Sequence, residues 1–290
     1  MKNFFLITTK HLEEALWFRD DEDFAVGMNY VAIVAHRHKG LVIFFFILMS
    51  NHVHFIVYGE REEVEAFIED YKGRYSHYFS KKYGVKNLLL DNDVDIRVIE
   101  LDNEGLEKAG AYVIMNSVAA NICSHPSQYK WGSGNTIFNP SIARGKPIKC
   151  FSKRTLRFML HSRVDDLPKN WTIGEDGFIL PRNYIDIDQV EGLFRTPKRF
   201  DFFLRNSSKA KKRLEANGNY PAFRDQSIIA GFPDLLRSLF GKKSFAELSE
   251  IEKTECLRQI KFRYSADTTQ AARVCGITYA EAARLTDMVG

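Results

Sequence analysis

The stretch VIFFFILMSNHVHFIVY, residues 42 to 58, decides how this chain folds. It holds two apolar runs rich in aromatic and β-branched residues, which are typical of strands. Ser50 and Asn51 separate the runs, and their short polar side chains suit a tight turn. The longest apolar run, Leu41 to Met49, is nine residues long, too short to cross the roughly 30 Å hydrocarbon layer of a membrane as a helix. The pattern therefore predicts a buried β-hairpin.

The segments around this hairpin add further strands and helices. Strands are predicted at residues 3 to 9 and 94 to 98, and helices, from their three- and four-residue apolar spacing, at 21 to 40, 64 to 84 and 104 to 123. The order strand, helix, strand, strand, helix, strand is that of a split βαβ unit. We therefore predict an α+β fold, with a ferredoxin-like antiparallel sheet and helices, followed by a mostly α-helical C-terminal region.

Length and composition exclude several classes of protein. The 290 residues exceed what one average domain needs, and a hydrophobic fraction of 45% with 23 Phe excludes a wholly disordered chain. The four cysteines are far apart and form no CxxC pair, which disfavours zinc sites and a disulfide framework. The N-terminus lacks the arrangement of a signal peptide. We expect a protein of the reducing cytoplasm.

Basic residues are concentrated after residue 140, although the net charge is only +4. A first cluster has six basic residues and no acid: Arg144, Lys146, Lys149, Lys153, Arg154 and Arg157. A second, from Arg195 to Arg213, has eight against one acid and includes Lys198, Arg199, Lys211, Lys212 and Arg213. Phenylalanines are interleaved with both, and such surfaces favour nucleic acid. A solvated charged surface is the alternative interpretation.

The segment after Ser249 has the spacing of a helix-turn-helix. It offers a small residue where two helices touch, a glycine four residues later for a positive φ, an apolar plug and a helix cap, namely Ala272, Gly276, Ile277 and Thr278. Arg273 and Arg284 would contact phosphates or bases. A plain helical hairpin is the alternative.

His52 and His54 are the first candidates for chemistry. Residues two apart on a strand point to the same face, so both imidazoles can approach one metal ion. His36 and His38 have the same spacing near a helix end, where they project about 200° apart, so we expect an unrelated surface pair there. Two partly exposed strand histidines without a metal remain the alternative.

Tyr112 and Asn116 are the second candidates, because residues four apart share one face of a helix. Asn116 offers a carbonyl oxygen as a third ligand, and two nitrogens with one oxygen suit Mg²⁺ or Mn²⁺. Tyr112 offers a nucleophile, whose activation needs a base or a nearby positive charge such as the metal or Lys108. Ordinary helix residues are the alternative.

Two blocks of the sequence resemble a known family. MSNHVHFIV, residues 49 to 57, resembles the histidine strand of HUH single-strand nucleases of the tyrosine-transposase kind. AYVIMNSVAANICSHPSQYKWGS, residues 111 to 133, resembles the tyrosine helix of REP-associated tyrosine transposases. The resemblance implies metal-binding roles for His52 and His54, a nucleophilic Tyr112 and a polar Asn116 one turn later. Ser50 and Ser117 depart from the family, which usually has proline there.

The resemblance also implies an activity. Tyr112 would attack a phosphodiester of single-stranded DNA, including hairpin-forming repeat ends, and rejoining would reverse the attack. No GxxxxGK[ST] loop is present, as expected of a reaction that needs no ATP. A non-catalytic, sequence-specific DNA-binding regulator and an RNA-binding protein are the rival hypotheses.

We accordingly predict three parts, acting as a monomer or homodimer. They are an HUH tyrosine transposase catalytic domain at residues 1 to 133, a basic DNA-binding extension at 134 to 248 and a helix-turn-helix at 249 to 290. The first part would hold the chemistry, and the residues after about 140 would supply most of the DNA affinity.

Overall fold

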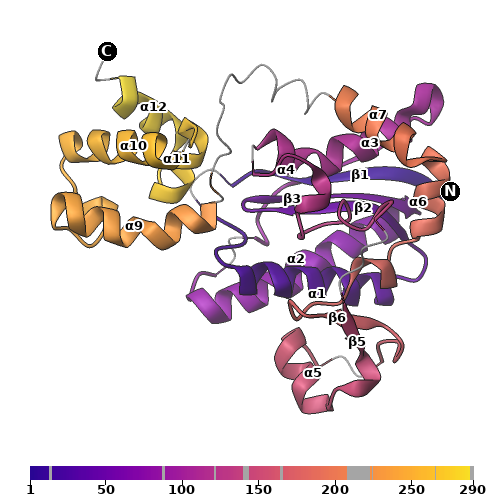
Figure 1. The fold of residues 1–290 in the computed structure, drawn as a ribbon. Helices are drawn as coiled ribbons and strands as arrows, with labels where there is room; N and C mark the ends of the chain where they lie inside the picture. The colour runs from indigo at the N-terminus through magenta and orange to yellow at the C-terminus, as the bar shows by residue number, and fades with distance from the viewer. Residues whose placement is uncertain are drawn as a thin grey trace.

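A four-stranded antiparallel sheet lies at the centre of the protein (Figure 1). The computed structural model describes residues 1–12, 15–86, 89–120, 122–139, 144–163, 166–207, 223, 225–264 and 266–287. The strands, in the spatial order β2-β3-β1-β4, are β1 (Asn3–Thr9), β2 (Val42–Met49), β3 (His52–Gly59) and β4 (Val94–Val98). All four lie where the sequence predicts strands, and Ser50 with Asn51 forms the turn of the β2–β3 hairpin.

Helices cover both faces of the sheet (Figure 1). They are α1 (Asp21–Arg37) and α2 (Arg61–Tyr83) on one face, and α3 (Gly105–Ile114) and α4 (Asn116–Ala119) on the other. Phe55 of β3 packs against Phe67 of α2. On the opposite face Phe45 of β2 packs so closely on Gly110 of α3 that a Cβ there would lie 2.6 Å from the ring. Because side chains alternate along a strand, His54 faces α3 while Phe55 faces α2.

The chain after the sheet packs onto both helical layers, the α1 side and the α3 side. It contributes β5 (Gly145–Pro147), α5 (Lys153–Leu160), β6 (Thr172–Gly174), α6 (Ile187–Phe194) and α7 (Pro197–Asn206). The lobe of β5, β6 and α5 lies against α1, where the Tyr30 hydroxyl donates to the carbonyl of His161 at 3.1 Å. On the α3 side, Phe194 of α6 contacts Phe45 of the sheet.

Among the described residues, buried hydrophobic side chains form two cores. The first runs from Phe5 to Leu204 and the second from Ile228 to Leu285. Residues 145 to 204 therefore share a core with the sheet. The division of function at residue 133 stays a prediction, and a truncation there would remove part of that core.

The second core belongs to a helical C-terminal unit, made of α9 (Asp225–Phe240), α10 (Glu250–Tyr264), α11 (Thr268–Cys275) and α12 (Tyr279–Asp287). Gly276 ends α11 with a φ of 69°, and the N–H of Ile277 donates to the carbonyl of Ala272 at 3.1 Å. The hydroxyl of Thr278 accepts from the N–H of Glu281 at 3.1 Å. The turn therefore has the positive-φ glycine and the cap that the sequence predicts. No helix in the described part of the chain is long and apolar enough to span a membrane.

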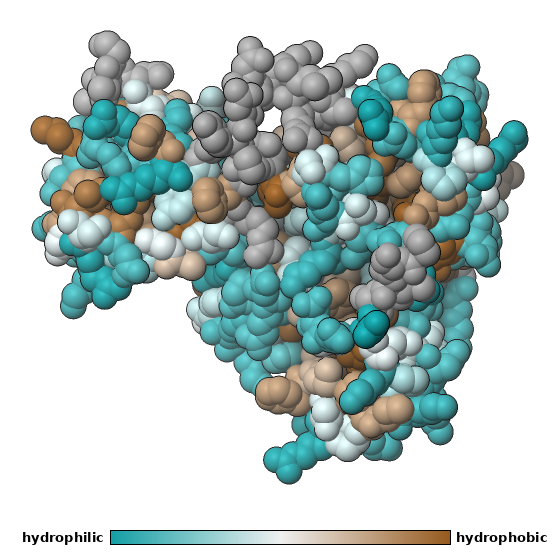
Figure 2. Space-filling model, in the orientation of Figure 1, coloured by the Kyte–Doolittle hydropathy of each residue, from teal (hydrophilic) through white to brown (hydrophobic). Residues whose placement is uncertain are grey.

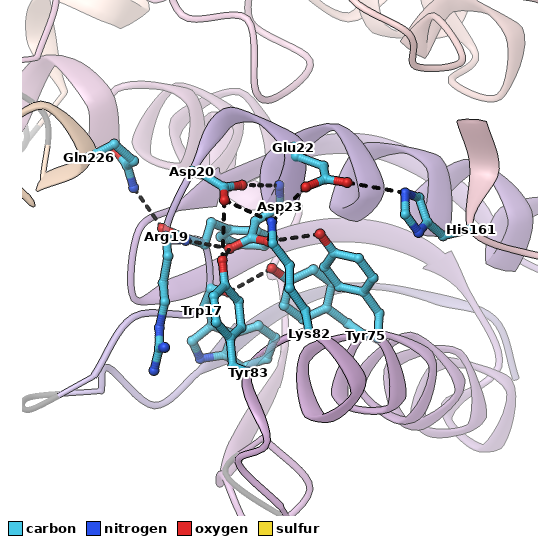
Figure 3. Close-up of polar contacts among 12 residues, drawn as sticks. Trp17, Arg19, Asp20, Glu22, Asp23, Tyr75, Lys82, Tyr83, His161 and Gln226 are labelled. Carbon is cyan, nitrogen blue, oxygen red and sulfur yellow. Dashed lines mark hydrogen bonds and ion pairs between the residues drawn. The ribbon is translucent and has the colours of Figure 1, made fainter. Parts of the chain in front are cut away.

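A polar network joins the start of α1 to the end of α2 (Figure 3). The Nζ atom of Lys82 lies 2.7 Å from a carboxylate oxygen of Asp20 and 2.8 Å from one each of Glu22 and Asp23. Asp23 is fully buried and also accepts a hydrogen bond from the Tyr83 hydroxyl at 2.8 Å. Opposite charges and several donors thus stabilise a carboxylate out of contact with water.

The same region fixes the segment before α1 against the hairpin turn. The Tyr75 hydroxyl donates to the carbonyl of Trp17 at 2.6 Å, as Figure 3 shows. The N–H groups of Trp17 and Phe18 donate to the carbonyl of Ser50 at 2.8 and 3.1 Å. Gln226 of α9 donates to the carbonyl of Phe18 at 2.7 Å. The turn that precedes His52 is therefore held from outside the sheet.

We expect acid to destabilise this region through His161. Burial lowers the pKa of His161, and although Glu22 lies 3.5 Å away and raises it, the net shift is downward from 6.5. Its contribution to stability is therefore complete above pH 6.5 and lost as the pH falls through the folded-state pKa. The urea midpoint of unfolding is read by tryptophan fluorescence at pH 7.5 and pH 5.5. Its decrease from pH 7.5 to pH 5.5 should be smaller in His161→Gln than in the wild type. His77→Gln, an exposed histidine of α2, should behave as the wild type; equal drops in all three proteins would contradict the assignment.

Candidate metal and tyrosine site

His52 and His54 lie side by side on β3, as their spacing predicts. Both are buried, and their ring centroids are 4.8 Å apart with the planes at 85°. The Nδ1 atom of His52 lies 2.9 Å from Oδ1 of Asn51, and that of His54 lies 2.9 Å from the hydroxyl of Thr8. Metal-binding histidines commonly hydrogen-bond through the ring nitrogen that is not the ligand. A metal at this site would therefore bind the Nε2 atoms.

His11, just beyond β1, completes a cluster of three imidazoles. One nitrogen from each of His11, His52 and His54 lies within 4.8 Å of the others. The pairing of β1 with β3 explains the meeting, because Thr8 is opposite His54 and the chain beyond Thr9 therefore passes His52. No motif in the sequence indicates this residue. Only the antiparallel register of the two strands could have revealed it.

The present orientation of His11 is a stacked one. Its ring lies 3.6 Å from that of His52, with the planes at 15°. A metal binds an imidazole nitrogen along its lone pair, in the plane of the ring, so two stacked rings do not meet at one ion. Ligation by His11 would require its ring to turn, which its exposed position permits. The cluster therefore supplies two buried imidazoles and one adjustable third.

Tyr112 lies on α3, facing the cluster. Its half-buried ring is centred 6.1 Å from that of His54, at 77°. A residue of the second sequence block and a histidine of the first are thus brought together between the sheet and the helix that covers it. A tyrosine oxygen and a histidine pair in one place can combine a nucleophile with a metal-held phosphate.

Asn116 lies one turn after Tyr112 and divides the helix. The sequence predicts one helix from Glu104 to Cys123, but the structure has α3 and α4 separated at Met115, with the helical residues ending at Ala119. The Nδ2 atom of Asn116 donates to the carbonyls of Tyr112 and Val113 at 3.1 and 2.9 Å, in competition with the regular backbone bonds. Asn116 is 4% exposed, and its role as a ligand stays a proposal.

His36 and His38 do not share a site. Nε2 of His36 lies 3.8 Å from Asp166, and Nδ1 of His38 lies 3.2 Å from Glu63. Their separate partners agree with the expected divergence of the two side chains. Each side chain is 16% exposed, so both histidines reach the surface only in part. Carboxylates from neighbouring elements cover both rings.

The first basic cluster is exposed throughout. Its members lie on the β5 and α5 lobe: Arg144, Lys146, Lys149, Lys153, Arg154 and Arg157. Because this lobe packs on α1, the cluster is on the opposite side of the sheet from Tyr112.

The other predicted DNA-binding residues differ in their surroundings. Lys198 is exposed, whereas Arg199 pairs with Glu104 at 2.8 Å. Arg273 pairs with the buried Asp225 at 3.2 Å, and Arg284 pairs with Glu250 at 2.6 Å. Contacts of these three arginines with DNA would compete with intramolecular pairs. The remaining members, Lys211, Lys212 and Arg213, lie outside the described residues.

Comparison with known proteins finds little sequence likeness. No family model matches the chain, and no curated protein matches it. Among solved structures, a REP-associated tyrosine transposase bound to a REP hairpin is similar, with 13% identity, a TM-score of 0.36, and coverage of 46% of this chain and 77% of that chain.

Proposed function

We propose that this protein is a metal-dependent transposase that cleaves and rejoins single-stranded DNA through a tyrosine intermediate. The observation that carries the proposal is the packing of Tyr112 of α3 against His54, which lies beside His52 on the facing strand β3. The strand order β2-β3-β1-β4 supports a ferredoxin-like catalytic unit of the HUH kind, since β3 separates two strands joined by α1.

In the proposed reaction the phenol oxygen of Tyr112 attacks the phosphorus of a phosphodiester. A bond forms between this oxygen and phosphorus, and the bond to the 3′-oxygen breaks. The phenol loses one proton and the departing 3′-oxygen gains one, leaving a 5′-phosphotyrosine and a free 3′-hydroxyl. His52 and His54, with Asn116 as the polar residue one turn after the nucleophile, would hold Mg²⁺ or Mn²⁺, which would draw charge from the phosphate. Rejoining is the reverse attack by a 3′-hydroxyl.

We expect His52→Ala and His54→Ala each to weaken Mn²⁺ binding by at least about tenfold in calorimetric titration, because each removes a ligand. His11→Ala should weaken it more than Asn116→Ala does, because a nitrogen of His11 lies within 4.8 Å of those of His52 and His54, whereas the amide of Asn116 donates to the carbonyls of Tyr112 and Val113. His77→Ala, exposed on α2, is the control and should bind as the wild type. If His52→Ala and His54→Ala both bind Mn²⁺ with wild-type affinity and EDTA has no effect on cleavage, the proposed metal site is refuted.

The basic cluster of the α5 lobe is the proposed DNA contact outside the catalytic centre. Lys153 and Arg154 occupy the first turn of α5, where the helix dipole disfavours cations by about 0.3–1 kcal/mol each. Among the described residues no ion pair is found for either of them or for Lys149. Phe158 beside them is 79% exposed, and Figure 2 shows hydrophobic patches among hydrophilic residues on this lowest lobe. Phosphate binding would offset the unfavourable charge, and the aromatic ring could stack on a base.

Charge reversal tests this contact. The triple variant Lys149→Glu, Lys153→Glu and Arg154→Glu should reduce the slope of log affinity against log salt by roughly 2 to 3, at about 0.7–0.9 for each phosphate that is no longer neutralised. The control is a second triple variant at exposed positions outside the α5 lobe, Lys39→Glu, Lys81→Glu and Lys86→Glu. It changes the net charge by the same amount and should keep most of the wild-type salt slope. Equal slopes for the two triple variants would show that only net charge matters.

The alternative function is a non-catalytic, sequence-specific DNA-binding regulator. It rests on the capped turn between α11 and α12, whose geometry suits a helix-turn-helix. Incubation with labelled single-stranded DNA and Mn²⁺ separates the two functions. A transposase yields a covalent adduct, whereas a regulator binds and releases the DNA intact.

A further inference from the structure

We infer that Asn51 is a positioning residue, which sets the hydrogen on His52 and holds the segment that carries His11. Asn51 is 6% exposed. Its Nδ2 atom donates to the carbonyl of Leu12 at 2.8 Å, and its Oδ1 atom lies 2.9 Å from Nδ1 of His52. Its backbone carbonyl accepts from the N–H of Leu12 at 3.1 Å. One residue thus joins the hairpin turn to the segment that follows the first strand.

The amide dictates which nitrogen of His52 carries hydrogen. An amide NH₂ can only donate and an amide oxygen can only accept. The contact of Nδ2 with the Leu12 carbonyl therefore directs Oδ1 of Asn51 at His52, and Nδ1 of His52 must be the protonated nitrogen. In a neutral imidazole the lone pair then lies on Nε2, the atom that a metal would bind.

The same residue holds Leu12 at both of its backbone groups, next to His11. A second asparagine acts on the same segment: Nδ2 of Asn92 donates to the carbonyl of Lys10 at 3.0 Å, and Asn92 is 7% exposed. Its Oδ1 atom accepts no hydrogen bond from the described residues. Asn92 therefore supports the same segment but has no contact that selects a tautomer. It supplies a matched control for Asn51.

The role of Asn51 in positioning a metal ligand rests on the proposed function, but the first test of its contact with His52 needs no metal. The metal-free full chain, labelled with ¹⁵N-histidine, is observed by long-range ¹H–¹⁵N correlation above pH 8, where imidazoles are neutral. His52 should be the Nδ1–H tautomer in the wild type and in Asn92→Ala. It should become a mixture in Asn51→Ala and return to the Nδ1–H form in Asn51→Asp, whose carboxylate still accepts.

Mn²⁺ titration of the same four proteins gives the second readout. We expect Asn51→Ala to bind at least about tenfold more weakly, as typical for loss of a partner of a ligand, and Asn92→Ala to bind within about threefold of wild type. An unchanged Nδ1–H tautomer in Asn51→Ala would overturn the inference. If that variant does not fold, loss of the Nδ1–H form in Asn51→Asp would overturn it instead. If the tautomer changes in Asn51→Ala but the wild type itself binds no Mn²⁺, the positioning role of Asn51 is confirmed and the proposed metal function is refuted.

Discussion

Tyr112→Phe should reduce covalent attachment to single-stranded DNA by at least about a thousandfold, because it removes the oxygen that forms the phosphotyrosine bond in the proposed reaction. DNA binding should remain within about threefold, since the change deletes one atom and little surface. The adduct is measured on a denaturing gel with end-labelled DNA, and binding by fluorescence anisotropy with the same strand.

Tyr129→Phe is the matched control for this experiment. The Tyr129 hydroxyl is buried and donates to the carbonyl of Leu48 at 2.7 Å, in the segment that follows the tyrosine helix. Its loss should lower stability by about 1 kcal/mol and leave adduct formation intact. An adduct of wild-type intensity in Tyr112→Phe would exclude Tyr112 as the nucleophile.

Lys82→Met should lower the free energy of unfolding by about 3 kcal/mol, at the lower end of the cost of breaking a buried ion pair. The reason is Asp23, which is fully buried and would lose its cation. Burial lowers the pKa of Lys82, but hydrogen bonds to Asp20, Asp23 and Glu22 raise it more, so the ammonium is charged in the folded protein. Urea unfolding followed by tryptophan fluorescence measures the loss.

Two further variants make this stability test specific. Lys81→Met removes the exposed neighbouring lysine and should change stability by no more than about 0.5 kcal/mol. Asp23→Asn combined with Lys82→Met should recover part of the loss, because no fully buried carboxylate is then left without its cation. If Lys82→Met is as stable as Lys81→Met, the network in Figure 3 contributes nothing measurable.

The sequence predicts the sheet well because its strands are long enough to show a period. The runs on either side of Ser50 and Asn51 become β2 and β3, and the two-residue period places His52 and His54 together. The segment from 145 to 204 is harder to predict, since its two strands have three residues each and its helices eight to ten. Such short elements carry too little periodicity to be identified.

The candidate site is predicted only where its residues lie on regular elements. His11 follows the end of β1, and its meeting with His52 depends on the register between β1 and β3, which no local pattern contains. The division of the helix at Met115 coincides with side-chain hydrogen bonds of Asn116 to the carbonyls of the preceding turn. Apolar spacing does not report such bonds.

Mapping the attachment site tests the central claim most directly. The wild-type protein is incubated with single-stranded DNA and Mn²⁺, digested with nuclease and trypsin, and analysed by tandem mass spectrometry. The tryptic peptide of residues 109 to 130 contains both Tyr112 and Tyr129, so the fragment ions distinguish the two. We predict a nucleotide mass on Tyr112 that EDTA abolishes. A nucleotide on Tyr129 or on another peptide would contradict the proposed function. So would the absence of an adduct with every single-stranded DNA that is tested.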